Sequence, residues 1–165
     1  MTAEQQASPS SVQAAIHQTK PFRSLGQETL IGLMLANEAV RRVFHDALAD
    51  VSELTQQQYN VLRILRGAGA AGLPTLAIAE RMIERTPGMT RMIDRLERKG
   101  LVARERSAED RRQVLCRLTP EGKKTLRKLD PVVEGIDDSV MTALTQKEQR
   151  ELLRLLNKVR LSTSA

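Results

Sequence analysis

Basic residues with helical spacing between residues 85 and 118 are the part of this sequence best suited to chemistry. Along residues 87–99, one face of a predicted helix carries polar and basic residues: Thr90, Arg91, Arg95 and Arg98. The opposite face is apolar, because its residues recur at i, i+3, i+4 and i+7: Met89, Met92, Ile93 and Leu96. One face can pack against a core, and the other is free to contact a polyanion such as DNA.

This helix has the dimensions and the residues needed to enter the major groove of B-DNA. A helix of about ten to twelve residues fits that groove, and short residues near its N-terminus, here Gly88 and Thr90, let the backbone approach closely. Arg91 and Arg95 can reach guanine O6 and N7 or the flanking phosphates, and the sequence leaves both roles open. A solvated charged face is the alternative for an isolated helix, but the basic segment that follows favours DNA.

A basic hairpin is predicted directly behind this helix. Residues 101–106 and 113–118 alternate as strands do, and the polar run 107–112 joins them. Gly100 precedes the first strand and can take the left-handed conformation that ends a helix. Four arginines lie on the hairpin: Arg104, Arg106, Arg111 and Arg112. A helix-turn-helix followed by such a hairpin is a winged helix.

Other residues that could do chemistry have weaker patterns. Asp110 could hold a wing arginine by charge-assisted hydrogen bonds or could be an ordinary acidic turn residue, and the local sequence favours neither. Cys116 falls in an apolar alternation and is interpreted as a buried thiol, with redox sensing as the weaker alternative. His17 and His45 lack partners at metal-ligand spacing, so neither a metal nor another cofactor is predicted. No set of nucleophile, base and orienting group is present, and we predict that the protein is not an enzyme.

The charge distribution agrees with DNA as the partner. The chain has 165 residues, enough for one domain with helical extensions, and a formal net charge of +6. Residues 85–112 contain nine Lys or Arg and five Asp or Glu, whereas residues 1–60 contain four and six. The single cysteine excludes an internal disulfide. Without an apolar run of about 18 residues or a leader-like start, we expect a cytoplasmic protein that does not enter a membrane.

The remaining elements are predicted from apolar spacing and capping residues. Residues 1–23 are expected to form a flexible extension, and residues 24–51 a long helix. A capping box that begins at Thr55 starts the next helix, which glycines end.

Two helices, over 74–83 and 87–99, then form the helix-turn-helix, and Pro74 suits the first turn of the former. Residues 120–161 are expected to be helical, with a kink at Pro131 and a second capping box that begins at Thr145.

Two segments resemble the MarR family of bacterial winged-helix regulators. They read TRMIDRLERKGLV at 90–102 and EDRRQVLCRLTPEG at 109–122, and with the flanking helices the resemblance covers about residues 24–161. It implies a mainly α fold with a small β-hairpin wing. In that fold the winged helix-turn-helix occupies about residues 55–119, and N- and C-terminal dimerisation helices occupy about 24–51 and 120–161.

The resemblance also implies how the protein acts. A homodimer binds a pseudo-palindromic operator in double-stranded DNA, with half-sites about 34–36 Å apart, and usually represses a nearby gene. The helix over 87–99 reads the major groove, and Arg112, oriented by Asp110, enters the minor groove. The DNA-binding residues expected from the motifs are Thr86, Pro87, Gly88, Thr90, Arg91, Arg95, Arg104, Arg106, Asp110, Arg111 and Arg112.

Members of this family often release DNA when a small aromatic or phenolic effector binds between the dimer helices and the DNA-binding lobe. The candidates for such a pocket are Met34, Phe44, His45 and Tyr59. The alternative function is that of an architectural or protein-binding winged-helix protein without operator specificity.

Overall fold

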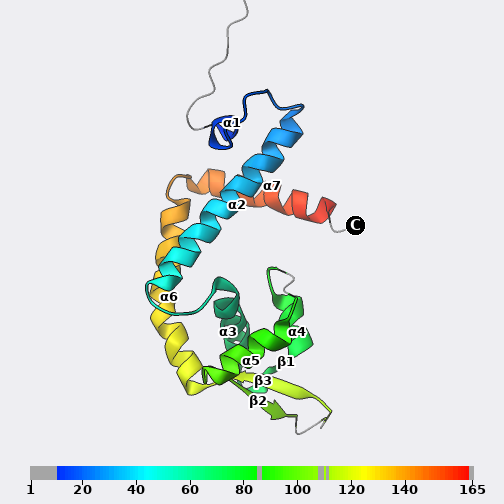
Figure 1. Cartoon of the computed structure of the whole chain (residues 1–165), viewed down its shortest axis with the longest axis vertical. Coiled ribbons are helices and arrows are strands. Elements are labelled where there is room, and N and C mark those ends of the chain that lie inside the picture. Colours follow the sequence, from blue (N-terminus) through cyan, green and yellow to red (C-terminus); the bar gives the residue numbers. More distant parts are fainter. Residues whose placement is uncertain (1–10, 85–86, 108–109, 111, 164–165) are drawn as a thin grey trace, which may run out of the picture. The chain divides into compact units, whose positions relative to one another are not determined.

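The structure is a computed structural model that describes residues 11–84, 87–107, 110 and 112–163 (Figure 1). The chain divides after residue 43 into two compact units, and helix α2 (Leu25–Ala49) runs across this division. The first unit also contains α1 (Val12–Ala15), whose N-cap Ser11 accepts a hydrogen bond from the amide of Ala14. Helix α1 is not apparent from the sequence, because four residues are too few for a helical periodicity.

The second unit is mainly helical and contains a small sheet, as expected. Its elements in chain order are α3 (Gln56–Ala68), the 3-10 turn η1 (Gly69–Ala71), β1 (Leu73–Pro74), α4 (Thr75–Arg81), α5 (Met89–Arg98), β2 (Val102–Arg106), β3 (Val114–Leu118), α6 (Pro120–Met141) and α7 (Gln146–Ser162). The helices α4 and α5 form the predicted helix-turn-helix, and β2 and β3 form the predicted hairpin.

Local capping chemistry sets the starts of three helices. Both predicted capping boxes are confirmed: the hydroxyls of Thr55 and Thr145 accept from amides three residues later, and the N3 side chains reach back to the cap amides. Thr119 caps α6 by accepting from the amide of Gly122. The helix α6 continues through Pro131.

The sheet has three antiparallel strands in the order β1-β3-β2. Cys116 of β3 lies between Leu73 of β1 and Arg104 of β2. The strand β1 was not predicted, because a two-residue strand has no alternation to detect. Pro74, expected in the first turn of a helix, belongs instead to this strand and takes the N-cap position of α4 in an extended conformation.

The core of the second unit is built from the apolar faces of α3, α4, α5 and α6 and from one side of the sheet. Its fully buried members include Leu62, Leu65, Ile78, Ile93, Leu96, Cys116, Leu126 and Leu129. Cys116 is 0% exposed, so the prediction of a buried thiol is confirmed. An ion pair between Arg66 and Asp130, at 2.7 Å, joins α3 to α6. This core holds α5 and the hairpin in place.

Candidate nucleic-acid interface

The helix α5 presents the predicted basic face. Met89, Ile93 and Leu96 are buried, and Met92 packs against the core from a partly buried position, so the apolar face is confirmed. Gly88 precedes the helix in the left-handed conformation with φ of 86°, which costs little for glycine alone. The helix therefore begins at Met89 and not at Pro87.

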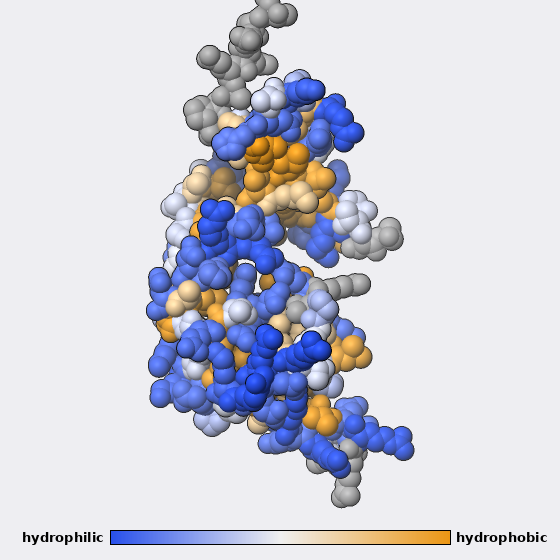
Figure 2. All heavy atoms as spheres, viewed as in Figure 1, coloured by the Kyte–Doolittle hydropathy of each residue, from blue (hydrophilic) through white to orange (hydrophobic). Residues whose placement is uncertain are grey.

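The polar side of α5 is available for contact. Thr90, Arg91 and Arg95 are exposed. Among the residues that the structure describes, the guanidinium groups of Arg91 and Arg95 form no hydrogen bond or ion pair. Figure 2 shows that the visible face carrying α5 and the hairpin is covered mainly by hydrophilic residues. This face can bind an anion without first breaking ion pairs at Arg91 or Arg95.

The turn of the hairpin is held by hydrogen bonds around Asp110. The Asp110 amide donates to Ser107 Oγ at 3.2 Å, and its carboxylate accepts from the Arg112 amide at 3.0 Å. The amide of Ser107 also donates to the carbonyl of Gln113, at 2.9 Å. Asp110 thus behaves as an acidic turn residue that fixes the backbone at Arg112, and no hydrogen bond to the Arg112 guanidinium is found among the described residues.

Arg106 and Arg112 are exposed on the hairpin, at the end of β2 and in the turn. Pro87 and Gly88 are exposed beside α5. Two predicted DNA-binding residues, Thr86 and Arg111, lie outside the described residues.

Arg104 differs from the other predicted DNA-binding arginines because its guanidinium is directed at α5. It lies 2.6 Å from Asp94 Oδ1 and 3.2 Å from Glu97 Oε2, and it donates to the carbonyl of Thr90 at 3.3 Å. Its side chain is 25% exposed. Partial burial lowers the pKa of Arg104, but hydrogen bonding to Asp94 and attraction by both carboxylates outweigh this effect and leave the pKa above its ordinary value.

The Arg104 cluster was not predicted from the sequence. Asp94 and Glu97 were not singled out, because acidic and basic residues are interspersed along α5 and no local signal distinguishes these two. The ion pairs depend on how the hairpin docks on the helix, which is a tertiary property. A second ion pair, between Arg117 and Glu105, bridges β3 and β2.

The structure does not bring the four predicted effector-pocket residues together within one unit. Met34 belongs to the first unit, whereas the others belong to the second. Tyr59 is 5% exposed in the core of the second unit, and burial is the main cause that raises its pKa above the ordinary value of 10.0. Phe44 is half-buried and His45 is exposed.

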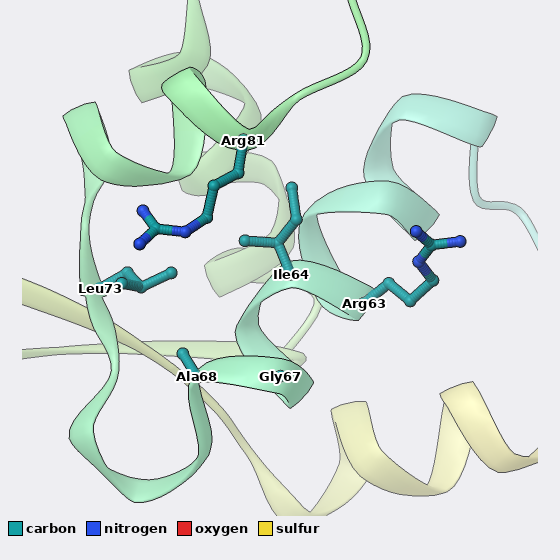
Figure 3. Close-up of a pocket in the computed structure, with 6 residues that line it drawn as sticks. All are labelled: Arg63, Ile64, Gly67, Ala68, Leu73 and Arg81. Carbon is teal, nitrogen blue, oxygen red and sulfur yellow. The ribbon is translucent and has the colours of Figure 1, made fainter.

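A separate pocket of about 320 Å³ lies beside α3, within the second unit (Figure 3). Ile64, Leu73 and Ala68 line its apolar part, and Arg81 extends over Leu73. Its volume is at the lower end of the range for small-molecule sites. None of the four predicted effector-pocket residues lines it.

The helix α4, a turn, the exposed basic helix α5 and the hairpin of β2 and β3 follow one another in the chain. This order defines a winged helix-turn-helix DNA-binding protein. A model of the MarR family matches residues 54–114. The chain is 30% identical over 134 residues to the transcriptional regulator HosA of Escherichia coli, in an alignment that covers 77% of this chain and 98% of HosA. The chain belongs to the MarR family, whose members are transcriptional regulators and not enzymes.

Solved structures agree with this assignment. A MarR transcription factor from Planctomyces limnophilus is 37% identical, with a TM-score of 0.63, over 83% of this chain and 98% of that chain. A mutant MarR from Escherichia coli, complexed with operator DNA, is 28% identical, with a TM-score of 0.70, over 77% of this chain and 89% of that chain. In the described residues of the present chain, no helix is both long and apolar enough to span a bilayer.

Proposed function

We propose that this protein is a homodimeric repressor that binds a specific pseudo-palindromic operator. One observation carries the proposal: Arg91 and Arg95 project from α5 without partners among the described residues, next to a hairpin whose Arg106 and Arg112 are exposed. The helix enters the major groove, and the hairpin lies over the adjoining minor groove with Arg112 in it. A MarR relative solved in complex with operator DNA supports operator binding.

The residues around the start of α5 allow the close approach that base reading needs. Pro87, Gly88 and Thr90 are exposed and small or compact, so the backbone can come near the base edges. Arg91 and Arg95 supply guanidinium groups that pair with guanine or with phosphate. Asp110 supports Arg112 by fixing the backbone of the turn.

Exposed apolar residues on α7 support the homodimer. They recur with helical spacing and are 38–63% exposed in the single chain: Leu152, Leu153, Leu155, Leu156, Val159 and Leu161. A stripe of this kind on a helix favours burial against another subunit. A twofold-symmetric dimer presents two copies of α5, which matches an operator with two related half-sites.

Family membership supports control of this binding by a small aromatic or phenolic effector. Phe44 and His45 are the predicted pocket residues that retain access to solvent in the second unit. A screen of such compounds, read as release of bound DNA, tests this part of the proposal. Failure of every phenolic compound to release DNA would exclude the effector class.

Selection of binding sites from random DNA tests the proposal itself. We expect recovered duplexes with two half-sites about 10 base pairs apart and an affinity at least about 10³-fold above that for random DNA. A ratio near one would instead support an architectural or protein-binding role. Sedimentation of the free protein should give the mass of a dimer. A monomer that still binds one half-site would contradict the proposal of a twofold-symmetric dimer.

Two variants separate base reading from anchoring. Arg91→Ala should lose about 1–3 kcal/mol at particular base pairs if Arg91 contacts a base. Arg112→Ala should weaken binding to all sequences and reduce the slope of log K against log[salt] by about one. Arg127→Ala, which removes an exposed arginine from α6, is the matched control and should leave both quantities unchanged. Equal effects of all three variants would exclude these roles.

A further inference from the structure

Arg104 occupies the point where the hairpin leaves the body of the second unit. The strand β1 pairs with β3 only at Leu115 and Cys116, and Arg104 lies opposite Cys116 on the other side of β3. Beyond the next pair, Glu105 and Leu115, the hairpin consists of β2 and β3 alone, ending at the pair Arg106 and Val114. Two-stranded hairpins are only marginally stable by themselves, so the direction of the tip depends on contacts at its base.

The Arg104 side chain supplies such contacts along most of α5. Its three acceptors are Thr90 O, Asp94 Oδ1 and Glu97 Oε2, which lie in successive turns on one side of the helix. A planar guanidinium with five donors can satisfy several acceptors at fixed angles, which a lysine ammonium cannot do as rigidly. Arg104 therefore fixes both the distance and the rotation between β2 and α5.

The charges of this cluster leave no excess positive charge for DNA. Arg104 contributes one positive charge, and Asp94 and Glu97 contribute two negative charges within 3.2 Å of it. Redirecting Arg104 to a phosphate would leave both carboxylates uncompensated on the DNA-facing side of the protein, which repels the same phosphates.

We propose that Arg104 is a positioning residue that locks the wing onto the recognition helix and does not itself contact DNA. Its effect on operator binding rests on the proposed function, whereas its effect on the hairpin does not. The lock aligns the exposed arginines of the wing with those of α5, so that both can engage one DNA duplex together.

Hydrogen exchange of the DNA-free protein tests the lock directly. We expect Arg104→Ala to accelerate exchange of the β2 and β3 amides, because the hairpin opens more often when its base is unpinned. Arg106→Ala removes an exposed arginine from the same strand and is the matched control, with exchange unchanged. Equal exchange in the two variants would overturn the proposal. If Arg104→Ala does not fold, Asp94→Asn replaces it, with the same expectation.

DNA binding provides a second test, in which the direction of the change in affinity distinguishes the two roles of Arg104. The probe is the duplex recovered from random DNA by the wild-type protein. Asp94→Asn removes a negative charge from the DNA-facing side. If Arg104 contacted DNA, this variant would therefore bind the duplex more tightly. The lock predicts weaker binding, by about two- to tenfold given typical coupling within ion-pair networks. Glu105→Gln is the control, because Glu105 pairs with Arg117 outside the cluster, and its loss should leave binding equal or tighter.

The salt dependence completes the test. Arg104→Lys keeps the charge but not the three-way geometry, so the lock predicts weaker binding with an unchanged slope of log K against log[salt]. Undiminished binding by Arg104→Lys, or tighter binding by Asp94→Asn, would overturn the proposal. If random DNA yields no preferred duplex, the proposed function fails, and the exchange experiment still decides whether Arg104 locks the hairpin.

Discussion

Gly122 offers a sharp test of packing between the winged helix and the long helix that follows it. Gly122 is buried in the first turn of α6, where a Cβ would lie 2.3 Å from the carbonyl oxygen of Leu101 and 2.7 Å from Leu118 Cδ1. The Leu101 carbonyl cannot easily move, because it accepts from the amide of Thr119 at 3.1 Å and joins α5 to β2. Replacement of Gly122 by alanine must therefore displace backbone at the base of the hairpin.

The expected magnitude follows from two opposing effects. Overpacking a closely fitted core site costs about 1–3 kcal/mol, and a contact of 2.3 Å with backbone belongs to the upper part of that range. Alanine gains about 1 kcal/mol over glycine within a helix. We expect Gly122→Ala to lower the free energy of unfolding by about 1–2 kcal/mol.

Gly135 is the matched control, because it lies in the same helix and a Cβ there would meet no atom within 4 Å. Gly135→Ala should raise the free energy of unfolding by up to about 1 kcal/mol. Urea unfolding followed by circular dichroism measures both variants, at one protein concentration because the proposed dimerisation would contribute to stability. The reasoning is refuted if Gly122→Ala is as stable as Gly135→Ala with the same m-value.

Two buried side chains give further predictions. The chain has a single tyrosine, so its absorbance reports Tyr59 alone: burial raises the pKa, and native Tyr59 should deprotonate above its ordinary value of 10.0. The unfolded chain then loses this proton at lower pH than the native protein does. The stability that comes from this difference is complete below pH 10.0 and is lost as the pH rises further. Tyr59→Phe should lack this pH-dependent loss of stability. A native midpoint at or below 10.0 would contradict this. Cys116 is fully buried and should react with a thiol reagent only after unfolding in urea, and rapid labelling of the native protein would show that the site opens.

Local chemistry is the part of this fold that could be predicted from sequence. The capping boxes at Thr55 and Thr145 depend only on residues three positions apart, and both form as predicted. The α5 faces depend on helical periodicity, and the hairpin depends on alternation, so both were also recognisable. Each of these patterns is complete within a short stretch of chain.

Features that depend on distant pairing could not be predicted. The strand β1 forms because Leu73 and Pro74 pair with β3, about 40 residues later in the chain. These two residues carry no local pattern that predicts a strand. The direction of Arg104 depends on the same docking, so the sequence alone grouped it with Arg106. The sequence leaves two roles open for Asp110, and only the folded turn shows that its carboxylate accepts a hydrogen bond from the backbone amide of Arg112.

The ion pairs also change what the basic composition means for DNA affinity. Arg104 and Arg117 are held by carboxylates, so they do not release counterions from DNA as free arginines do. In the described residues, four exposed arginines of α5 and the hairpin have guanidinium groups with neither an ion pair nor a hydrogen bond: Arg91, Arg95, Arg106 and Arg112.

Each phosphate neutralised contributes about −0.9 to the slope of log K against log[salt]. These four side chains then account for a slope of at most about −3.6 per protomer, before any contribution from residues outside the described part. The slope should be measured for the wild-type protein and for the variant that lacks all four arginines. The difference between the two slopes gives the contribution of arginines that have no ion pair. If the fourfold variant kept most of the slope, other basic residues would carry the electrostatic contact and the division between held and free arginines would be wrong.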